Sequence, residues 1–203
     1  MKVLLSLTLG LLLHFAASAE KFYKATIVFN DGHEAEGLVT LPEKPTDETI
    51  RYKENDDAKA VKYKSEELAR LVFPASDGNN VIFERVPSQK GILNHKTMVI
   101  WLQVAKRGYA TLYFCDWKSA MGTGGGMMVG YDRYWYVMRE GETASTIVAW
   151  SGWGTAEHDF RKRAGEYFKD DAELAAKIGD KQFKREDIYK LLEEYNKWKA
   201  KNE

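Results

Sequence analysis

Apolar and polar residues alternate along most of the chain, the pattern of half-buried β-strands. Between residues 21 and 150 this period recurs in short runs separated by turn residues such as Asn30-Asp31-Gly32 and Glu140-Gly141. Because the turns are short, we expect antiparallel hairpins. The predicted strands are Tyr23–Phe29, Glu34–Leu41, Ile50–Lys53, Ala58–Tyr63, Arg70–Phe73, Val81–Val86, Thr97–Ala105, Tyr109–Cys115, Tyr131–Arg139 and Thr143–Trp150. Residues 97–105 also fit a helical stripe, but their β-branched and aromatic side chains favour a strand.

After Gly154 the apolar residues recur at three- and four-residue steps, which is typical of amphipathic helices. We expect the last stripe to dock on its own domain. The pattern predicts an α+β protein with a largely antiparallel β body, sandwich or barrel-like, over residues 20–154, and two to three helices over 155–203 packed against it. The apolar stripes comprise Phe160, Ala164, Tyr167 and Phe168, then Leu174, Ala175 and Ile178, then Ile188, Leu191, Leu192, Tyr195 and Trp198.

The first 19 residues have the features of an export signal. Lys2 supplies a positive start, residues 3–13 are largely apolar, and Ala17-Ser18-Ala19 has the small-x-small pattern that signal peptidase accepts. We therefore predict cleavage before Glu20 and a periplasmic or secreted protein. A membrane anchor is disfavoured because the apolar stretch is shorter than the roughly 20 residues that span a bilayer. A lipoprotein would need a cysteine at position 20, so no lipid anchor is predicted.

The charges balance, with 30 Lys and Arg against 30 Asp and Glu. This balance gives the protein no electrostatic reason to bind nucleic acid. No second long apolar stretch follows the predicted signal, so we expect no transmembrane segment in the mature chain. Cys115 is the single cysteine and excludes an internal disulfide. Because it follows the apolar run Leu112-Tyr113-Phe114, we expect a buried thiol, with a reactive or intermolecular thiol as the alternative.

Two segments of the chain carry a resemblance to known proteins. Their residues are Trp101-Leu102-Gln103-Val104-Ala105, Gly108 and Leu112-Tyr113, then Tyr167-Phe168-Lys169-Asp170, Leu174, Lys177-Ile178, Phe183, Asp187-Ile188 and Tyr195-Asn196. They resemble a group of uncharacterised exported proteins common in Bacteroidota. The resemblance covers residues 97–203, and a weaker one lies in the N-terminal hairpin. It implies an envelope or secreted location and a β-then-α layout, but no activity, because none is established for that group. This chain departs from the group at Gly122–Gly126 and in the tryptophan-rich stretch 131–153.

The glycine-rich stretch Gly122–Gly126 does not fit a nucleotide-binding loop. A dinucleotide fingerprint starting at Gly122 needs glycine where Met127 stands. The span Gly125–Gly130 has phosphate-loop spacing, but Tyr131 follows in place of the lysine that neutralises phosphate. We therefore predict a flexible hairpin loop and no nucleotide cofactor.

Other catalytic and metal-binding patterns are missing from the sequence. His33, His95 and His158 are scattered and do not have metal-ligand spacing, so no metal site is predicted. Ser151 stands in Trp-Ser-Gly-Trp-Gly and not in the G-x-S-x-G elbow of hydrolases. Acidic residues are too numerous for one pair to be picked out as a glycosidase couple. No catalytic residue or cofactor is assigned.

Aromatic residues cluster between positions 131 and 153, and this is the feature that most favours a function. Alternation along a strand places Tyr131 and Trp135 on one face and Tyr134 and Tyr136 on the other. Flat rings can stack on sugars or peptides, whereas rings covered on both faces would form core. We take Tyr131, Trp135, Trp150 and Trp153 as candidate ligand-binding residues.

The sequence favours a non-catalytic envelope or secreted module that binds a protein partner or a glycan through this aromatic-rich surface. The alternative is a hydrolase of cell-wall or polysaccharide material that uses carboxylates gathered in space. A purely structural envelope protein without a small ligand is a third possibility.

Overall fold

A computed structural model describes residues 20–202 apart from 93, 124–125 and 153. The predicted export signal and Trp153 therefore lie outside the described residues. Within them, strands precede helices. The strands are β1 (Tyr23–Phe29), β2 (Glu34–Val39), β3 (Thr49–Lys53), β4 (Val61–Lys64), β5 (Leu68–Pro74), β6 (Asn80–Gly91), β7 (Asn94–Lys106), β8 (Ala110–Thr123), β9 (Gly126–Arg139) and β10 (Thr146–Trp150), followed by α1 (Ala156–Tyr167), α2 (Ala172–Gly179) and α3 (Ile188–Asn202).

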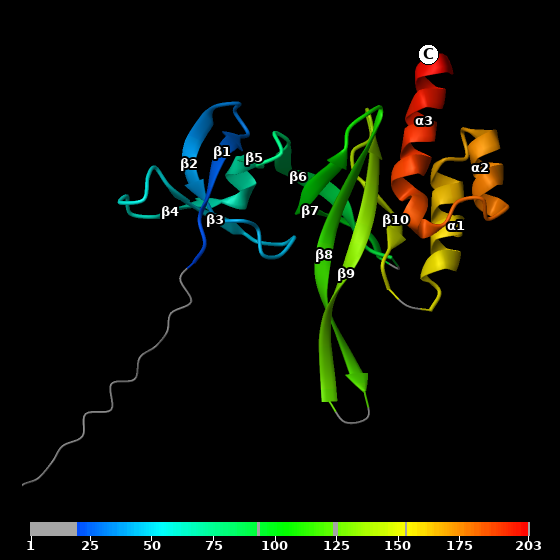
Figure 1. Ribbon diagram of the computed structural model, residues 1–203, viewed down its shortest axis with the longest axis horizontal. Coiled ribbons are helices and arrows are strands. Elements are labelled where there is room, and N and C mark those ends of the chain that lie inside the picture. The colour runs from blue at the N-terminus through cyan, green and yellow to red at the C-terminus, as the bar shows by residue number, and fades with distance from the viewer. Residues whose placement is uncertain (1–19, 93, 124–125, 153, 203) are drawn as a thin grey trace, which may run out of the picture.

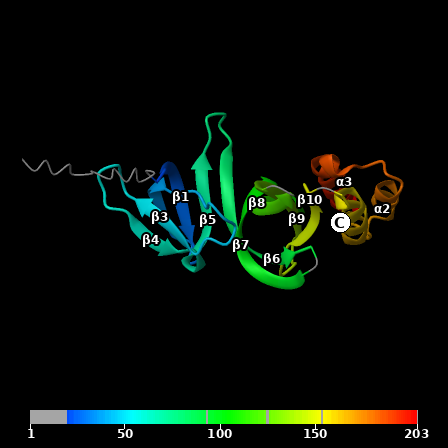
Figure 2. The ribbon, with the colours of Figure 1, turned by 90° about the horizontal axis from the view of Figure 1, so that it is seen from below.

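The strands form one antiparallel sheet in the order β10-β9-β8-β7-β6-β5-β1-β2-β3-β4. The α+β fold with a C-terminal helical cap is confirmed. The molecule is elongated, with β1–β5 at one end, the curved β6–β10 part in the middle and the helices at the other end (Figures 1 and 2). No helix in the described part of the chain is long and apolar enough to cross a membrane.

The N-terminal strands enclose their own core, in which Ile27 and Leu71 are fully buried. Trp101 of β7 closes this core, and its indole Nε1 donates to Ser65 Oγ at 3.0 Å. Ser65 Oγ in turn donates to the carbonyl of Asp47 at 2.7 Å. These bonds join the N-terminal part to the middle of the sheet.

The middle of the sheet curls until β10 meets β6. Ser145 N donates to the carbonyl of Pro87 at 2.8 Å, and Gln89 N donates to the carbonyl of Ser145 at 3.0 Å. The interior of the curl holds a second core. Its buried members are Val86, Ile100, Leu102, Tyr113, Cys115, Tyr136 and Ile147.

The helices cover the outer face of β8–β10 and bury their apolar stripes in a third core with Leu112 and Val137. Asn196 of α3 pairs with the backbone at the start of β8: its Oδ1 accepts from Ala110 N at 2.8 Å and its Nδ2 donates to Ala110 O at 3.0 Å. Gly108 leaves room for this amide, because a Cβ there would lie 2.2 Å from Asn196 Nδ2. The stripe of the last helix thus docks on its own chain, as the sequence predicted.

Strands β8 and β9 are longer than the sequence predicted. Their pairing runs without a break from Ala110↔Arg139 to Thr123↔Gly126, through the stretch that we expected to be a loop. The difference arises because glycine is depleted in strands, so Gly122 and Gly126 indicated a loop, whereas backbone pairing does not require a side chain.

Candidate functional site

An open groove of about 1040 Å³ lies between α1, the β9–β10 hairpin, the end of β6 and the turn that follows β6. We call it the α1 groove. Its volume is slightly above the usual range for ligand pockets, which is about 300–1,000 Å³. Its apolar wall is formed by Ile92, Ile147, Trp150 and Tyr167.

Trp150, one of the predicted ligand residues, is held rigidly in this wall. Its ring stacks on Tyr134, with the centroids 6.2 Å apart. Gly152 lies against the same ring, and a Cβ there would approach Trp150 Cζ3 to 1.5 Å. Arg185 Nη1 donates to the carbonyls of Trp150 and Gly152, each at 3.0 Å. The indole Nε1 is buried without a hydrogen-bond partner among the described residues, so Trp150 contributes apolar ring surface to the groove.

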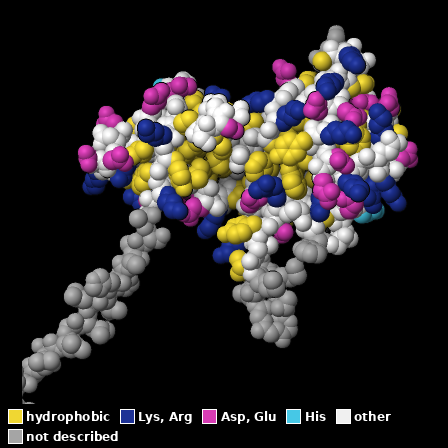
Figure 3. Space-filling view, viewed as in Figure 1, with side chains coloured by type: hydrophobic (Ala, Val, Ile, Leu, Met, Phe, Trp, Pro, Cys, Tyr) yellow, Lys and Arg dark blue, Asp and Glu magenta, His cyan; other side chains and the backbone are white. Residues whose placement is uncertain are grey.

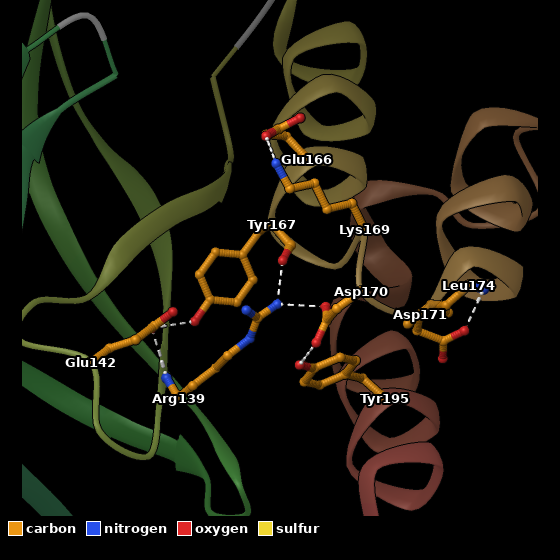
Figure 4. Close-up of polar contacts among 9 residues, drawn as sticks. All are labelled: Arg139, Glu142, Glu166, Tyr167, Lys169, Asp170, Asp171, Leu174 and Tyr195. Carbon is orange, nitrogen blue, oxygen red and sulfur yellow. Dashed lines mark hydrogen bonds and ion pairs between the residues drawn. The ribbon is translucent and has the colours of Figure 1, made fainter. Parts of the chain in front are cut away.

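Arg139 of β9 forms the end wall of the α1 groove (Figure 4). Its guanidinium lies over the rings of Tyr167 and Tyr195, 4.5 and 5.2 Å from their centroids. Nη2 donates to Asp170 Oδ1 at 2.8 Å and also to the carbonyl of Tyr167. Tyr195 Oη donates to the other oxygen of Asp170 at 2.7 Å. Stacking and charge-assisted bonds fix the direction of the guanidinium.

Glu142, in the turn between β9 and β10, completes the end wall. Its Oε2 accepts hydrogen bonds from Tyr167 Oη at 2.6 Å and from Arg139 N at 2.8 Å. Burial raises the pKa of Tyr167, and the bond to Glu142 acts in the same direction. The phenol therefore stays protonated and keeps donating to the carboxylate.

The charges along the α1 groove are balanced and include both signs. Its cationic residues are Arg139, Lys162, Arg163 and Lys169, and its acidic residues are Glu142, Asp159, Glu166 and Asp170. Several are held in place: Lys169 pairs with Glu166 at 2.6 Å, and Arg163 donates to the carbonyl of Ile92. The groove can therefore receive groups of either sign beside an apolar wall.

A second, smaller hollow of about 360 Å³ lies between the loop Pro42–Pro45 and the middle of the sheet. Tyr131 at its rim is 68% exposed. Deeper in lies Phe114, under the guanidinium of Arg133 at 4.4 Å. Arg133 binds Asp116 through two nitrogens, each at 2.8 Å. We call this the Tyr131 surface; in Figure 3 hydrophobic side chains gather over the middle of the molecule.

The structure describes three of the four predicted ligand residues, and it separates them. Tyr131 and Trp135 lie on one face of β9, as expected from their spacing, but Trp135 packs against the helical core while Tyr131 is exposed. Trp150 lines the α1 groove, and Trp153 is outside the described residues. These aromatic residues do not form one continuous platform.

Sequence reasoning did not identify the end wall of the α1 groove. Arg139, Glu142 and Asp170 come from separate segments, and nothing in their local pattern distinguishes them from other surface charges. One available indication was Tyr167, an aromatic residue on the helical stripe whose hydroxyl needs a partner when buried.

Among the described residues, no group of three or more His, Cys, Asp or Glu side chains is arranged to hold a metal ion. No protein-family model, curated protein or solved structure matches the chain.

Proposed function

We propose that the protein is a non-catalytic binding module of the cell envelope or secreted space, and that it holds a segment of a partner protein in the α1 groove. The observation that carries this proposal is the combination of an apolar wall at Trp150 with fixed charges of both signs. A peptide segment offers apolar side chains, charges of both signs and backbone groups along one extended length. Few other ligand classes match all three.

The rigidity of the groove supports a binding role. Arg139 is held by two rings and a carboxylate, and Trp150 is held by Gly152 and Arg185. Side chains ordered before binding lose little conformational entropy when a ligand arrives. Such preorganisation favours affinity for a defined segment.

The carboxylates in the groove fit binding better than hydrolysis. Glycoside hydrolysis needs one carboxylic acid that donates a proton to the leaving group. Glu142 accepts two hydrogen bonds through one oxygen, and Asp170 accepts bonds on both oxygens. The oxygens that accept these bonds hold Tyr167, Arg139 and Tyr195 in place. This arrangement weighs against the alternative of a polysaccharide hydrolase at this site.

A glycan is the second candidate ligand, and the Tyr131 surface favours it. Tyr131 presents an exposed ring, and the neighbouring Arg133–Asp116 pair offers planar donors and acceptors. Sugars are bound by such rings together with polar groups beside them. Binding of a polysaccharide that is lost in Tyr131→Ala but kept in Tyr189→Ala, where the tyrosine is 43% exposed, would support this second function.

Site-specific photo-crosslinking tests the proposed peptide site. A photoreactive residue replaces Lys162 in the α1 groove or, as a matched control, the exposed Lys59 in the connection between β3 and β4. In envelope extracts of the native organism we expect one protein to be captured at position 162 and not at 59. Adding Thr146→Trp, which narrows the groove, should abolish the adduct. No adduct, equal adducts at both positions, or an adduct that survives Thr146→Trp would refute the proposal.

A further inference from the structure

The hollow of the Tyr131 surface lies where two neighbouring strands separate. Among the described residues, the pairing of β7 with β8 ends at Gln103↔Phe114. Beyond that pair the loop Pro42–Pro45 takes the place of β8 beside β7, because Trp101 N donates to the carbonyl of Pro45 at 2.8 Å. The hollow lies between this loop and β8.

The loop that forms one wall of the hollow is held in place. Asp47 Oδ2 accepts hydrogen bonds from the backbone N of Glu43 at 2.7 Å and of Lys44 at 3.0 Å. The bond from Trp101 to Pro45 fixes the same loop to the sheet. A wall that is already ordered loses little conformational entropy when a ligand binds.

The floor of the hollow is a row of three side chains on neighbouring strands. Phe83, Gln103 and Phe114 lie opposite one another on β6, β7 and β8, so they share one face of the sheet, and all three line the hollow. Phe83 makes an edge-to-face contact with Phe73, with the centroids 5.9 Å apart, and Phe114 lies under the guanidinium of Arg133 at 4.4 Å. The amide of Gln103 is therefore flanked by two fixed rings.

The polar groups of the hollow are available to a ligand. The described part of the chain offers the side-chain amide of Gln103 no hydrogen-bond partner, so its N–H groups and its oxygen are all unused. Beside it, Arg133 binds Asp116 through Nε and Nη2, which leaves its other N–H groups and further lone pairs of the carboxylate for a ligand. Donors and acceptors thus lie side by side between aromatic rings.

The hollow carries no net charge. Glu43 and Lys44 of the loop balance each other, and Asp116 is paired with Arg133. A site without net charge has no electrostatic attraction for an anion or a cation. An uncharged ligand fits it best.

We propose that the hollow binds one uncharged sugar ring of a polysaccharide, and that Gln103 selects this ring through hydrogen bonds to its hydroxyl groups. The apolar faces of a sugar ring stack on aromatic side chains. Each hydroxyl group both donates and accepts, as do the Gln103 amide and the Arg133–Asp116 pair together. This inference rests on the second candidate function, glycan binding, and is independent of the peptide proposed for the α1 groove.

The size of the hollow agrees with one unit of a longer polymer. Its volume of about 360 Å³ is near the lower end of the usual range for ligand pockets, about 300–1,000 Å³. Tyr131 at the rim is exposed, so its ring can contact the next unit of the same polymer.

A peptide side chain would use the hollow less completely. An apolar side chain could stack on Phe83 and Phe114, but it would leave the Gln103 amide without a hydrogen-bond partner, which costs binding free energy. A charged side chain would gain nothing from a hollow without net charge. The sugar ring uses the rings and the amide together.

Isothermal titration calorimetry of residues 20–203 tests the proposal. The probes are soluble hexasaccharides of glucose, mannose, xylose and N-acetylglucosamine, with hexagalacturonate as the charged probe. We expect at least one uncharged probe to bind and hexagalacturonate not to bind. Gln103→Leu keeps the approximate size of the side chain and removes the amide, so it should weaken binding by about tenfold or more. Gln182→Leu, at an exposed position after α2, is the matched control and should bind like the wild type.

A second variant separates loss of binding from loss of folding. Gln103→Glu keeps the shape of the side chain but lacks the amide N–H groups, and it should also weaken binding by about tenfold or more. The melting temperature of each variant shows whether it is folded. The proposal is overturned if no uncharged probe binds, if hexagalacturonate binds most tightly, or if a folded Gln103→Leu or Gln103→Glu protein binds normally.

The same titrations distinguish this site from the function on which it rests. Binding that survives both changes at Gln103 but is lost in Tyr131→Ala would keep glycan binding and refute the hollow as its site. Binding of no sugar would refute both. Capture of a protein by a photoreactive residue at the exposed Lys44 would assign the hollow to a peptide and overturn the proposal.

Discussion

Tyr167 at the end of α1 donates a hydrogen bond of 2.6 Å to Glu142 in the turn between β9 and β10. This bond ties the helical cap to the hairpin that forms the other side of the α1 groove (Figure 4). The ring of Tyr167 also supports the guanidinium of Arg139. One side chain therefore maintains both the width of the groove and the direction of its cation.

Replacing Tyr167 with phenylalanine tests this bond. The ring remains, but Glu142 loses its phenolic donor, so we expect the free energy of unfolding to fall by about 1 kcal/mol. Urea unfolding measures the change. Tyr189→Phe is the control, because Tyr189 is 43% exposed, and it should leave stability unchanged. Equal stability of Tyr167→Phe and the wild type would show that the bond contributes nothing.

Gly108→Ala should destabilise the contact between α3 and β8. The added Cβ would lie 2.2 Å from Asn196 Nδ2, so the amide must leave the backbone groups of Ala110. Losing two hydrogen bonds at a partly buried position is expected to cost about 2 kcal/mol. Chemical unfolding measures this loss of unfolding free energy, with Gly91→Ala as the control because a Cβ there meets nothing within 4 Å. A similar loss of stability in both variants would contradict the proposed clash with Asn196.

The thiol of Cys115 should be inert in the folded protein. The residue is 7% exposed, and burial raises its pKa to about 12. The reactive thiolate is therefore scarce at neutral pH. We expect a thiol reagent at pH 8 to label the unfolded protein at once. It should label the native protein only as fast as the fold opens and exposes Cys115. Rapid labelling of the native protein would instead indicate an accessible, reactive thiol.

Alkaline pH should weaken the fold in part through Tyr113. Burial is the main cause that raises the pKa of Tyr113 from 10.0 to about 12, and nearby Glu84 adds to it. Above pH 10 the unfolded chain loses this proton while the folded protein retains it, so stability falls as pH rises. Tyr113→Phe should reduce the slope of unfolding free energy against pH between 10 and 12. An identical slope in both proteins would exclude this contribution.

The fold class could be predicted from sequence because local periodicity determines most of it. The alternating residues from Tyr23 to Phe29, which predicted a strand, lie on β1, and the stripe from Ile188 to Trp198 lies on α3. Gly122 and Gly126 were assigned to a loop because glycine carries no strand preference. Pairing between β8 and β9 nevertheless keeps Gly122 and Gly126 in strands.

The candidate site could not be predicted in the same way, because distant segments form it. Ile92, Trp150 and Arg163 become neighbours only after β10 has curled back to β6 and α1 has docked. Likewise, the spacing of Tyr131 and Trp135 predicted their shared strand face. It contained no information about which part of that face the helices cover.

The strand order also has a consequence for the folding pathway. β1 to β5 pair with one another, and Trp101 of β7 closes their core, so this end of the sheet can form while residues 104–203 are still unfolded. The bond between Asn196 and Ala110, by contrast, closes a loop of 86 residues. Contacts so distant along the chain form late because of their loop-closure entropy. Docking of the C-terminal helix is thus the step that completes the native state.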